Sequence, residues 1–74
     1  MNFVVEKDVE AGERVGAGET FQIIKISIED PNGNSVEITP IVNQSKHFQS
    51  DDDLKQYLSD WFDIPVKNVR LTEI

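Results

Sequence analysis

An alternating run of ten residues, TFQIIKISIE at positions 20–29, constrains the fold more than any other feature of this sequence. Every second position in its later half is an isoleucine, which predicts a β-strand with one apolar face formed by Ile24, Ile26 and Ile28. Phe21 and Ile23 fall on the opposite parity. Two arrangements are open at this end of the strand: both faces are covered, or a β-bulge shifts the register.

A turn signal and a second alternation follow directly. Residues 30–33, Asp-Pro-Asn-Gly, place a proline with fixed φ before an Asn-Gly pair that tolerates the positive φ needed to close a hairpin. Residues 35–39 then return with a valine and an isoleucine on one face. Because Pro40 cannot donate a hydrogen bond to a neighbouring strand, this strand either lies at a sheet edge or ends there. The pattern predicts an antiparallel hairpin over residues 21–39.

The best helix signal begins at Ser50. This serine can cap the helix amino terminus, with Asp53 three residues later in the position of a capping box. Asp51, Asp52 and Asp53 all fall in the first turn, where the positive end of the helix dipole favours carboxylates. We expect the helix to end through Pro65, because a proline disfavours helical backbone at the residue before it.

The same segment is amphipathic. Its apolar side chains recur at spacings of three and four residues and share one arc: Leu54, Tyr57, Leu58, Trp61 and Phe62. Its polar side chains lie opposite: Asp52, Gln56, Ser59 and Asp60. We therefore expect about three turns of helix with both Trp61 and Phe62 in the core. The alternative is that one of these two aromatics stays at the rim and marks an interface.

Four further segments complete the outline. Residues 2–9 contain Phe-Val-Val and suit a short strand, and residues 69–74 suit a last strand. Residues 11–18, with glycines at positions 12, 16 and 18, predict a flexible loop. Residues 42–49 are expected to form a polar connection.

Together these segments predict a single acidic domain over residues 1–74 with an α+β fold. The element order is β-β-β-α-β, and the expected architecture is a small, mainly antiparallel sheet with one amphipathic helix packed on one face. Most of the core should come from two apolar rows, the strand isoleucines Ile24, Ile26 and Ile28 and the helix residues Leu54, Leu58 and Trp61.

Few side chains here could support catalysis or bind a metal ion. The chain has no cysteine and one histidine, His47, so thiolate and multi-imidazole sites have no donors. Three consecutive aspartates at residues 51–53 point in different directions on a helix, unlike the ligands of a calcium cage. Residues 11–18 precede a strand and lack the Gly-Lys-Ser/Thr of a phosphate loop. We expect no enzyme activity, no cofactor and no metal.

Charge and hydropathy argue against contact with nucleic acid or a membrane. Fourteen acidic residues against seven basic ones give a net charge of -7, which disfavours binding to either anionic surface. No apolar run approaches the roughly 20 residues that cross a bilayer, and the amino terminus lacks the basic-then-apolar order of a signal peptide. We expect a cytoplasmic protein.

The charge distribution suggests a protein-binding function. Residues 50–63 hold five aspartates and one lysine, and a second acidic stretch lies near the amino terminus. Fourteen carboxylates match the charge of about 24 Å of duplex, which has one charge per about 1.7 Å. The first hypothesis is an inhibitor that mimics DNA and occupies the basic nucleic-acid-binding surface of a partner protein. Its candidate partner-binding residues are Asp51, Asp52, Asp53, Asp60 and Asp63, with Glu6, Asp8, Glu10 and Glu13 as a second patch.

Two other interpretations stay open. Surface acids also keep a small protein soluble and monomeric, with no further role. The second functional hypothesis is a structural or assembly protein that self-associates through a sheet edge into a homodimer, because the Pro40 strand and the short last strand are candidate edges.

Overall fold

The computed structural model describes residues 1–14, 16 and 20–74. The four strands are β1 (Asn2–Asp8), β2 (Gln22–Glu29), β3 (Ser35–Glu37) and β4 (Arg70–Glu73). The helices are α1 (Ala11–Arg14) and α2 (Asp51–Phe62), and two 3-10 turns are η1 (Thr39–Ile41) and η2 (Val66–Asn68).

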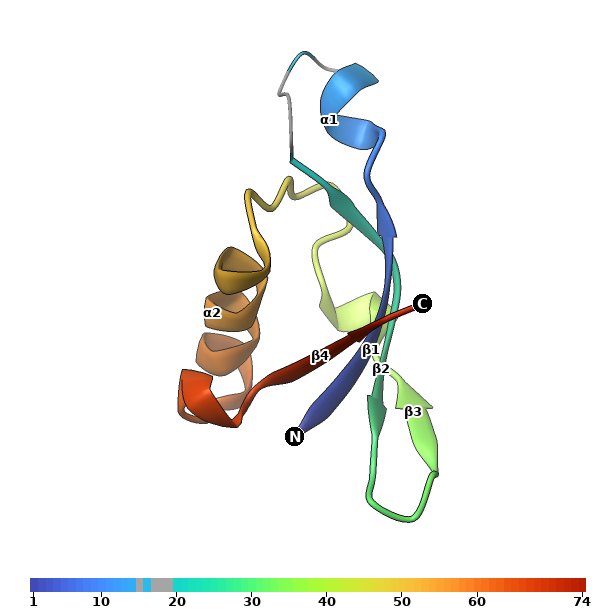
Figure 1. Cartoon of the computed structure of the whole chain (residues 1–74), viewed down its shortest axis with the longest axis vertical. Coiled ribbons are helices and arrows are strands. Elements are labelled where there is room, and N and C mark those ends of the chain that lie inside the picture. The colour runs from blue at the N-terminus through green and yellow to red at the C-terminus, as the bar shows by residue number, and fades with distance from the viewer. Residues whose placement is uncertain (15, 17–19) are drawn as a thin grey trace.

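The strands form one sheet in the order β3-β2-β1-β4, and α2 lies on one side of it (Figure 1). β1 pairs antiparallel with β2, and β2 pairs antiparallel with β3. β4 runs parallel to β1, with Asn2 opposite Arg70 and Val5 opposite Glu73. The predicted α+β fold, with one long helix on one face of the sheet, is confirmed. The sheet is mixed because the chain crosses over through α2 before β4 returns beside β1.

A β-bulge decides which residues of β2 face the core. Lys25 pairs with Glu6 but Ile23 pairs with Lys7, so Ile24 is the extra residue. Because of the bulge, Ile23 faces the same side as Ile26, and both are buried, whereas Ile24 is 47% exposed. Of the two arrangements open at this strand end, the bulge is the one observed. The predicted core role of Ile24 is wrong, because Ile24 is the extra residue of the bulge and its side chain is turned away from the core.

The hairpin over residues 21–39 is confirmed. Asp30 N donates to Asn34 O at 2.8 Å and Gly33 N donates to Asp30 O at 3.0 Å. Gly33 has φ 88°, a backbone conformation that favours glycine. β3 lies at the sheet edge and ends before Pro40, which falls in η1. Both consequences expected of that proline therefore occur together.

The predicted cap opens α2. Ser50 Oγ accepts from Asp53 N at 3.1 Å. Asp53 Oδ2 accepts from Gln49 N at 3.2 Å, one residue before the capping serine. Two backbone donors at the helix start thus receive side-chain acceptors, as a capping box provides.

The end of α2 differs from the prediction. The helix stops at Phe62 because Asp63 adopts the left-handed conformation, with φ 54° and ψ 49°. Ile64 N then donates to Ser59 O at 3.1 Å, and Ser59 Oγ donates to Ile64 O. A left-handed residue that returns an N–H to the last turn ends a helix by itself. The restriction that Pro65 places on Ile64 acts only after the helix has ended.

The core draws on a segment that was expected to be polar. Within residues 42–49, Val42 is buried and Phe48 has no exposed surface. Phe48 exchanges two backbone hydrogen bonds with Phe21, of 2.8 and 2.9 Å, and its ring packs edge-on against Tyr57 with the centroids 5.3 Å apart. The prediction of a polar connection is therefore wrong at these two positions. The fully buried large side chains are Phe3, Val5, Ile23, Ile26, Phe48, Leu54 and Leu58.

The two neighbouring aromatic residues at the end of α2 differ in burial: Phe62 packs against the core and Trp61 does not. Phe62 continues the Leu54–Leu58 line at four-residue spacing, and its ring packs on Phe3 at 5.5 Å. Trp61 is 55% exposed. The expected core position is wrong for Trp61, because it lies on the flank of the apolar arc, about 60° from Leu58 on a helix of 3.6 residues per turn.

The segment after β1 is partly helical. Ala11–Arg14 forms the single turn α1, at one end of the long axis (Figure 1), so the predicted loop is wrong for these four residues. Gly16 has φ 73° and donates its N–H to Glu13 O at 3.2 Å, which closes the turn. The remaining part of the predicted loop, including Gly18, lies outside the described residues.

Candidate protein-binding surface

The nine candidate acids come from two parts of the fold. Five belong to α2 and its carboxyl end, beside the sheet, and four belong to β1 and the α1 region (Figure 1). Their bonding partners divide them into carboxylates that hold the fold together and carboxylates that face solvent without a cation.

Asp51 belongs to a structural ion pair. Lys7 Nζ lies 2.5 Å from Asp51 Oδ1 and 2.7 Å from Glu73 Oε1, and it sits 4.6 Å from the centre of the Phe21 ring. The Lys7 side chain is only 11% exposed. Burial lowers the pKa of Lys7, but the hydrogen bonds that its ammonium group donates to Asp51 and Glu73 outweigh this effect, and the pKa is raised. One cation thereby links β1, the start of α2 and β4.

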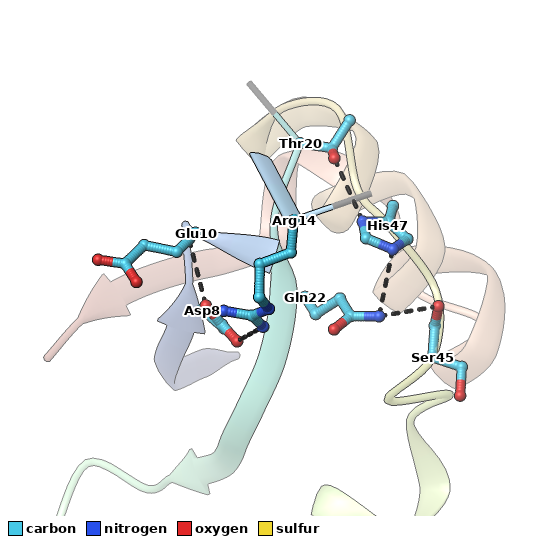
Figure 2. Close-up of polar contacts among 7 residues, drawn as sticks. All are labelled: Asp8, Glu10, Arg14, Thr20, Gln22, Ser45 and His47. Atoms are coloured by element: carbon cyan, nitrogen blue, oxygen red, sulfur yellow. Dashed lines mark hydrogen bonds and ion pairs between the residues drawn. The ribbon is translucent and has the colours of Figure 1, made fainter. Parts of the chain in front are cut away.

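Asp8 is also paired. Arg14 Nη2 donates to Asp8 Oδ2 at 2.5 Å, and Glu10 N donates to Asp8 Oδ1 at 3.2 Å (Figure 2). The hydrogen bond from Arg14 lowers the pKa of Asp8 below its ordinary value. Asp8 therefore ties α1 to the end of β1. In the described chain, Glu6, Glu10 and Glu13 form no ion pair of their own.

Three aspartates, two on α2 and one directly after its last residue, form what we call the acidic stripe: Asp52, Asp60 and Asp63. All three are exposed, and none lies within 4.0 Å of a cationic side chain among the residues that the structure describes. Asp52 and Asp60 are eight residues apart on the outer side of the helix, and Gln56 between them donates to Asp60 Oδ1 at 2.9 Å. Asp53 is committed to the helix cap. The stripe is thus the part of α2 whose negative charge is free for a partner.

His47 links the segment before α2 to β2 (Figure 2). Its Nδ1 lies 3.2 Å from Thr20 Oγ1, and its Nε2 lies 3.3 Å from Gln22 Nε2, which also donates to Ser45 O at 3.1 Å. An amide nitrogen only donates, so His47 Nε2 accepts and the ring proton lies on Nδ1, directed at Thr20. With both ring nitrogens bonded to neutral groups, His47 positions a loop in this arrangement.

No group of three His, Asp or Glu side chains that could hold a metal ion is found in residues 1–14, 16 and 20–74. Across the same residues, no helix has the length and apolar character to cross a bilayer.

A cleft that sequence reasoning missed lies at the start of β1. It has a volume of about 700 Å³, and two cationic and two acidic side chains line it: Lys67, Arg70, Glu29 and Asp30. The amino-terminal ammonium of Met1 also lies in its wall and donates to Asn68 O at 2.8 Å. The two acids and the two cations come from segments about 37 residues apart, 29–30 and 67–70, so no local spacing indicates that they share a cleft. They meet because β4 and β2 flank β1.

Comparison of the chain with protein-family models, with curated proteins and with solved structures finds no match in any of the three.

Proposed function

We propose that this chain is a non-catalytic protein-binding module, an acidic DNA mimic that occupies the basic nucleic-acid-binding surface of a partner protein in the cytoplasm. The observation that supports it best is the acidic stripe, a row of exposed carboxylates without cation partners on a rigid, capped helix. A helix fixes the spacing of charges in a way that a mobile acidic tail does not, and pre-ordered charges lose less entropy on binding.

The spacing of the three carboxylates determines how closely the acidic stripe matches the charge density of DNA. At 1.5 Å per residue, Asp52 and Asp63 are separated by about 16.5 Å along the helix axis. Three charges enclose two intervals over that length, so their mean spacing is about 8 Å, against one charge per 3.4 Å for a single DNA strand. The acidic stripe alone is therefore a sparse mimic. We expect the second patch, through Glu6, Glu10 and Glu13, to add to the field that steers the partner.

The ion pairs change the weight given to individual residues. Asp51 and Asp8 are held by Lys7 and Arg14, so part of their charge is already neutralised within the chain. We expect these two to contribute mainly to stability, and Asp52, Asp60 and Asp63 to contribute mainly to binding.

The test begins with capture from a nuclease-treated bacterial lysate, followed by purification of the captured protein. Support requires a basic DNA-binding protein that is released at moderate salt and displaced by added duplex. The triple variant D52N/D60N/D63N should weaken this binding at least tenfold and flatten its dependence on salt. The variant E6Q/E10Q/E13Q removes the same number of charges from the second patch. If both variants bind as the unmodified chain does, the proposal is wrong.

A second candidate function, self-association into a homodimer, is favoured by the free edge of β4. Arg70 N donates to Met1 O and Ile74 N donates to Val5 O, both at 2.9 Å, so alternate residues of β4 turn their backbone groups toward β1. Leu71 and Glu73 consequently direct theirs to the other side, where the sheet order places no further strand of the described chain. Such an edge can pair with a second copy.

Analytical ultracentrifugation separates the two candidates. An edge-paired dimer should form without any added protein, and it should not weaken as salt rises, because backbone pairing involves no net charge. A chain that stays monomeric up to millimolar concentration at both low and high salt excludes the dimer and leaves the DNA-mimic proposal standing.

A further inference from the structure

The cleft at the start of β1 has the size of a ligand site. It opens between η2 and the turn that joins β2 to β3, and its volume of about 700 Å³ lies within the range of about 300–1,000 Å³ typical of small-molecule sites. Met1 and Asn2 also line it. The acidic stripe takes no part in this cleft, so a ligand bound in the cleft would be independent of the proposed function.

The sheet register sets a cation and a carboxylate on either side of Asn2. Asn2 pairs with Arg70 on β4 and with Glu29 on β2, so the three residues form one row across the sheet. Residues directly opposite in a sheet direct their side chains to the same face. Two strand spacings place the Cα atoms of Arg70 and Glu29 about 9.6 Å apart.

The basic wall is unusual for a chain with twice as many acids as bases. The ion pairs of the described chain use Lys7, Arg14 and Lys25. Lys67 and Arg70 lie within 4.0 Å of no carboxylate among the described residues, although Glu29 and Asp30 line the same cleft. The scaffold therefore holds opposite charges apart, which suits a ligand that carries both signs.

The acidic wall is pre-organised. Asp30 Oδ1 accepts from Asn32 N at 2.9 Å and from Asn34 N at 3.0 Å, so the turn fixes the orientation of this carboxylate. Neither bond uses Asp30 Oδ2. A carboxylate already fixed by its own turn loses little freedom when it binds an ammonium group.

We propose that this cleft binds a short zwitterionic molecule, with its carboxylate against Lys67 and Arg70 and its ammonium group against Glu29 and Asp30. A peptide of two or three residues with free ends has the required chemistry. Extended chains span about 3.3–3.6 Å per residue, so a tripeptide reaches about 10 Å, comparable with the roughly 9.6 Å between the Cα atoms of Arg70 and Glu29. The walls are exposed, so we expect a dissociation constant on the order of millimolar.

The test is a titration of the ¹⁵N-labelled full chain with triglycine, followed by amide shifts. Triglycine should move the amides of Asn2, residues 32–34 and residues 67–70 in a saturable way. N-acetyl-triglycine lacks the ammonium group and triglycine amide lacks the carboxylate, so each should bind about fivefold more weakly or worse.

Variants of the chain assign the two ends of the ligand. R70Q should lower the affinity for triglycine about fivefold and leave the affinity for triglycine amide unchanged. E29Q should also lower the affinity for triglycine about fivefold, but it should leave the affinity for N-acetyl-triglycine unchanged. K55Q, which removes a cation from α2, is the matched control and should behave as the unmodified chain. The proposal is overturned if the shifts do not saturate or do not cluster at the cleft. It is equally overturned if the blocked peptides bind as well as triglycine does, or if K55Q matches R70Q.

Discussion

Lys7 and Asp51 are 44 residues apart in the chain, yet their side chains meet at 2.5 Å and join the central strand to the first turn of α2. The contact joins a cation from β1 to an aspartate in the first turn of α2, where the positive end of the helix dipole also stabilises a carboxylate. A residue chosen from sequence as a partner-binding acid is, in the fold, one end of an internal clamp.

Loss of this clamp should destabilise the protein. K7Q leaves Asp51 and Glu73 without their cation and removes the ammonium group that lies over the Phe21 ring, so we expect a loss of about 1–2 kcal/mol. The half-exposed carboxylates keep the value below that of a fully buried pair. The control K25Q breaks an exposed 3.7 Å pair with Glu37 and should cost less than about 0.5 kcal/mol. Urea unfolding measures both, and equal values would contradict a structural role for Lys7.

The same clamp predicts a loss of stability at alkaline pH. The pKa of Lys7 is raised in the folded chain, so its contribution is fully present below the ordinary value of 10.5 and is lost as pH rises through the higher folded value. Unfolding free energies from pH 9 to 12 should therefore fall more steeply for the unmodified chain than for K7Q. Parallel curves would contradict the pKa shift.

The Asp8–Arg14 pair should lose its stabilising effect at acidic pH instead. The pKa of Asp8 is lowered by Arg14, so the pair stabilises the fold above the ordinary carboxyl value of 3.8 and that contribution is lost as pH falls through the lower folded value. R14Q should be less stable than the unmodified chain at pH 6, and the difference should shrink toward zero below pH 3.8. A difference that is the same at both pH values would show that Arg14 acts by packing.

Phe48 should behave as a core residue despite its position in a polar segment. F48A removes a fully buried ring that contacts Phe21 and Tyr57, and we expect a loss of about 3–5 kcal/mol. W61A removes a larger side chain, but that side chain is 55% exposed, so the loss should stay below about 1.5 kcal/mol. Thermal unfolding of the two variants is the direct comparison, and a larger loss for W61A would contradict the burial of Phe48 and the exposure of Trp61.

The helix cap offers a smaller and more local test. S50A removes the acceptor for Asp53 N and should cost about 1 kcal/mol. S35A, at an exposed position of β3, is the matched control and should change stability by less than about 0.5 kcal/mol. Urea denaturation resolves this difference, and similar values for the two variants would show that the cap contributes little.

Local sequence patterns predicted the elements well where a short-range preference decides the structure. The Asp-Pro-Asn-Gly turn, the alternation on either side of it and the Ser50 cap each depend on residues within about four positions. Hence the hairpin, α2 and the α+β class were all predictable. The candidate acids could be named in the same way, because charge and helix position are properties of the sequence.

Which acids remain unpaired depended on tertiary structure. Parallel return of β4 beside β1 brought Glu73 to Lys7 and Arg70 opposite Asn2, and the bulge turned Ile24 outward while Ile23 joined the core. Phe48 became a core residue because its backbone pairs with Phe21 and its ring packs against Phe21 and Tyr57. By itself the sequence determined where strands and helix form, since those preferences are local. The tertiary structure decided which side chains are buried, paired or free, since each of those depends on contacts between segments far apart in the chain.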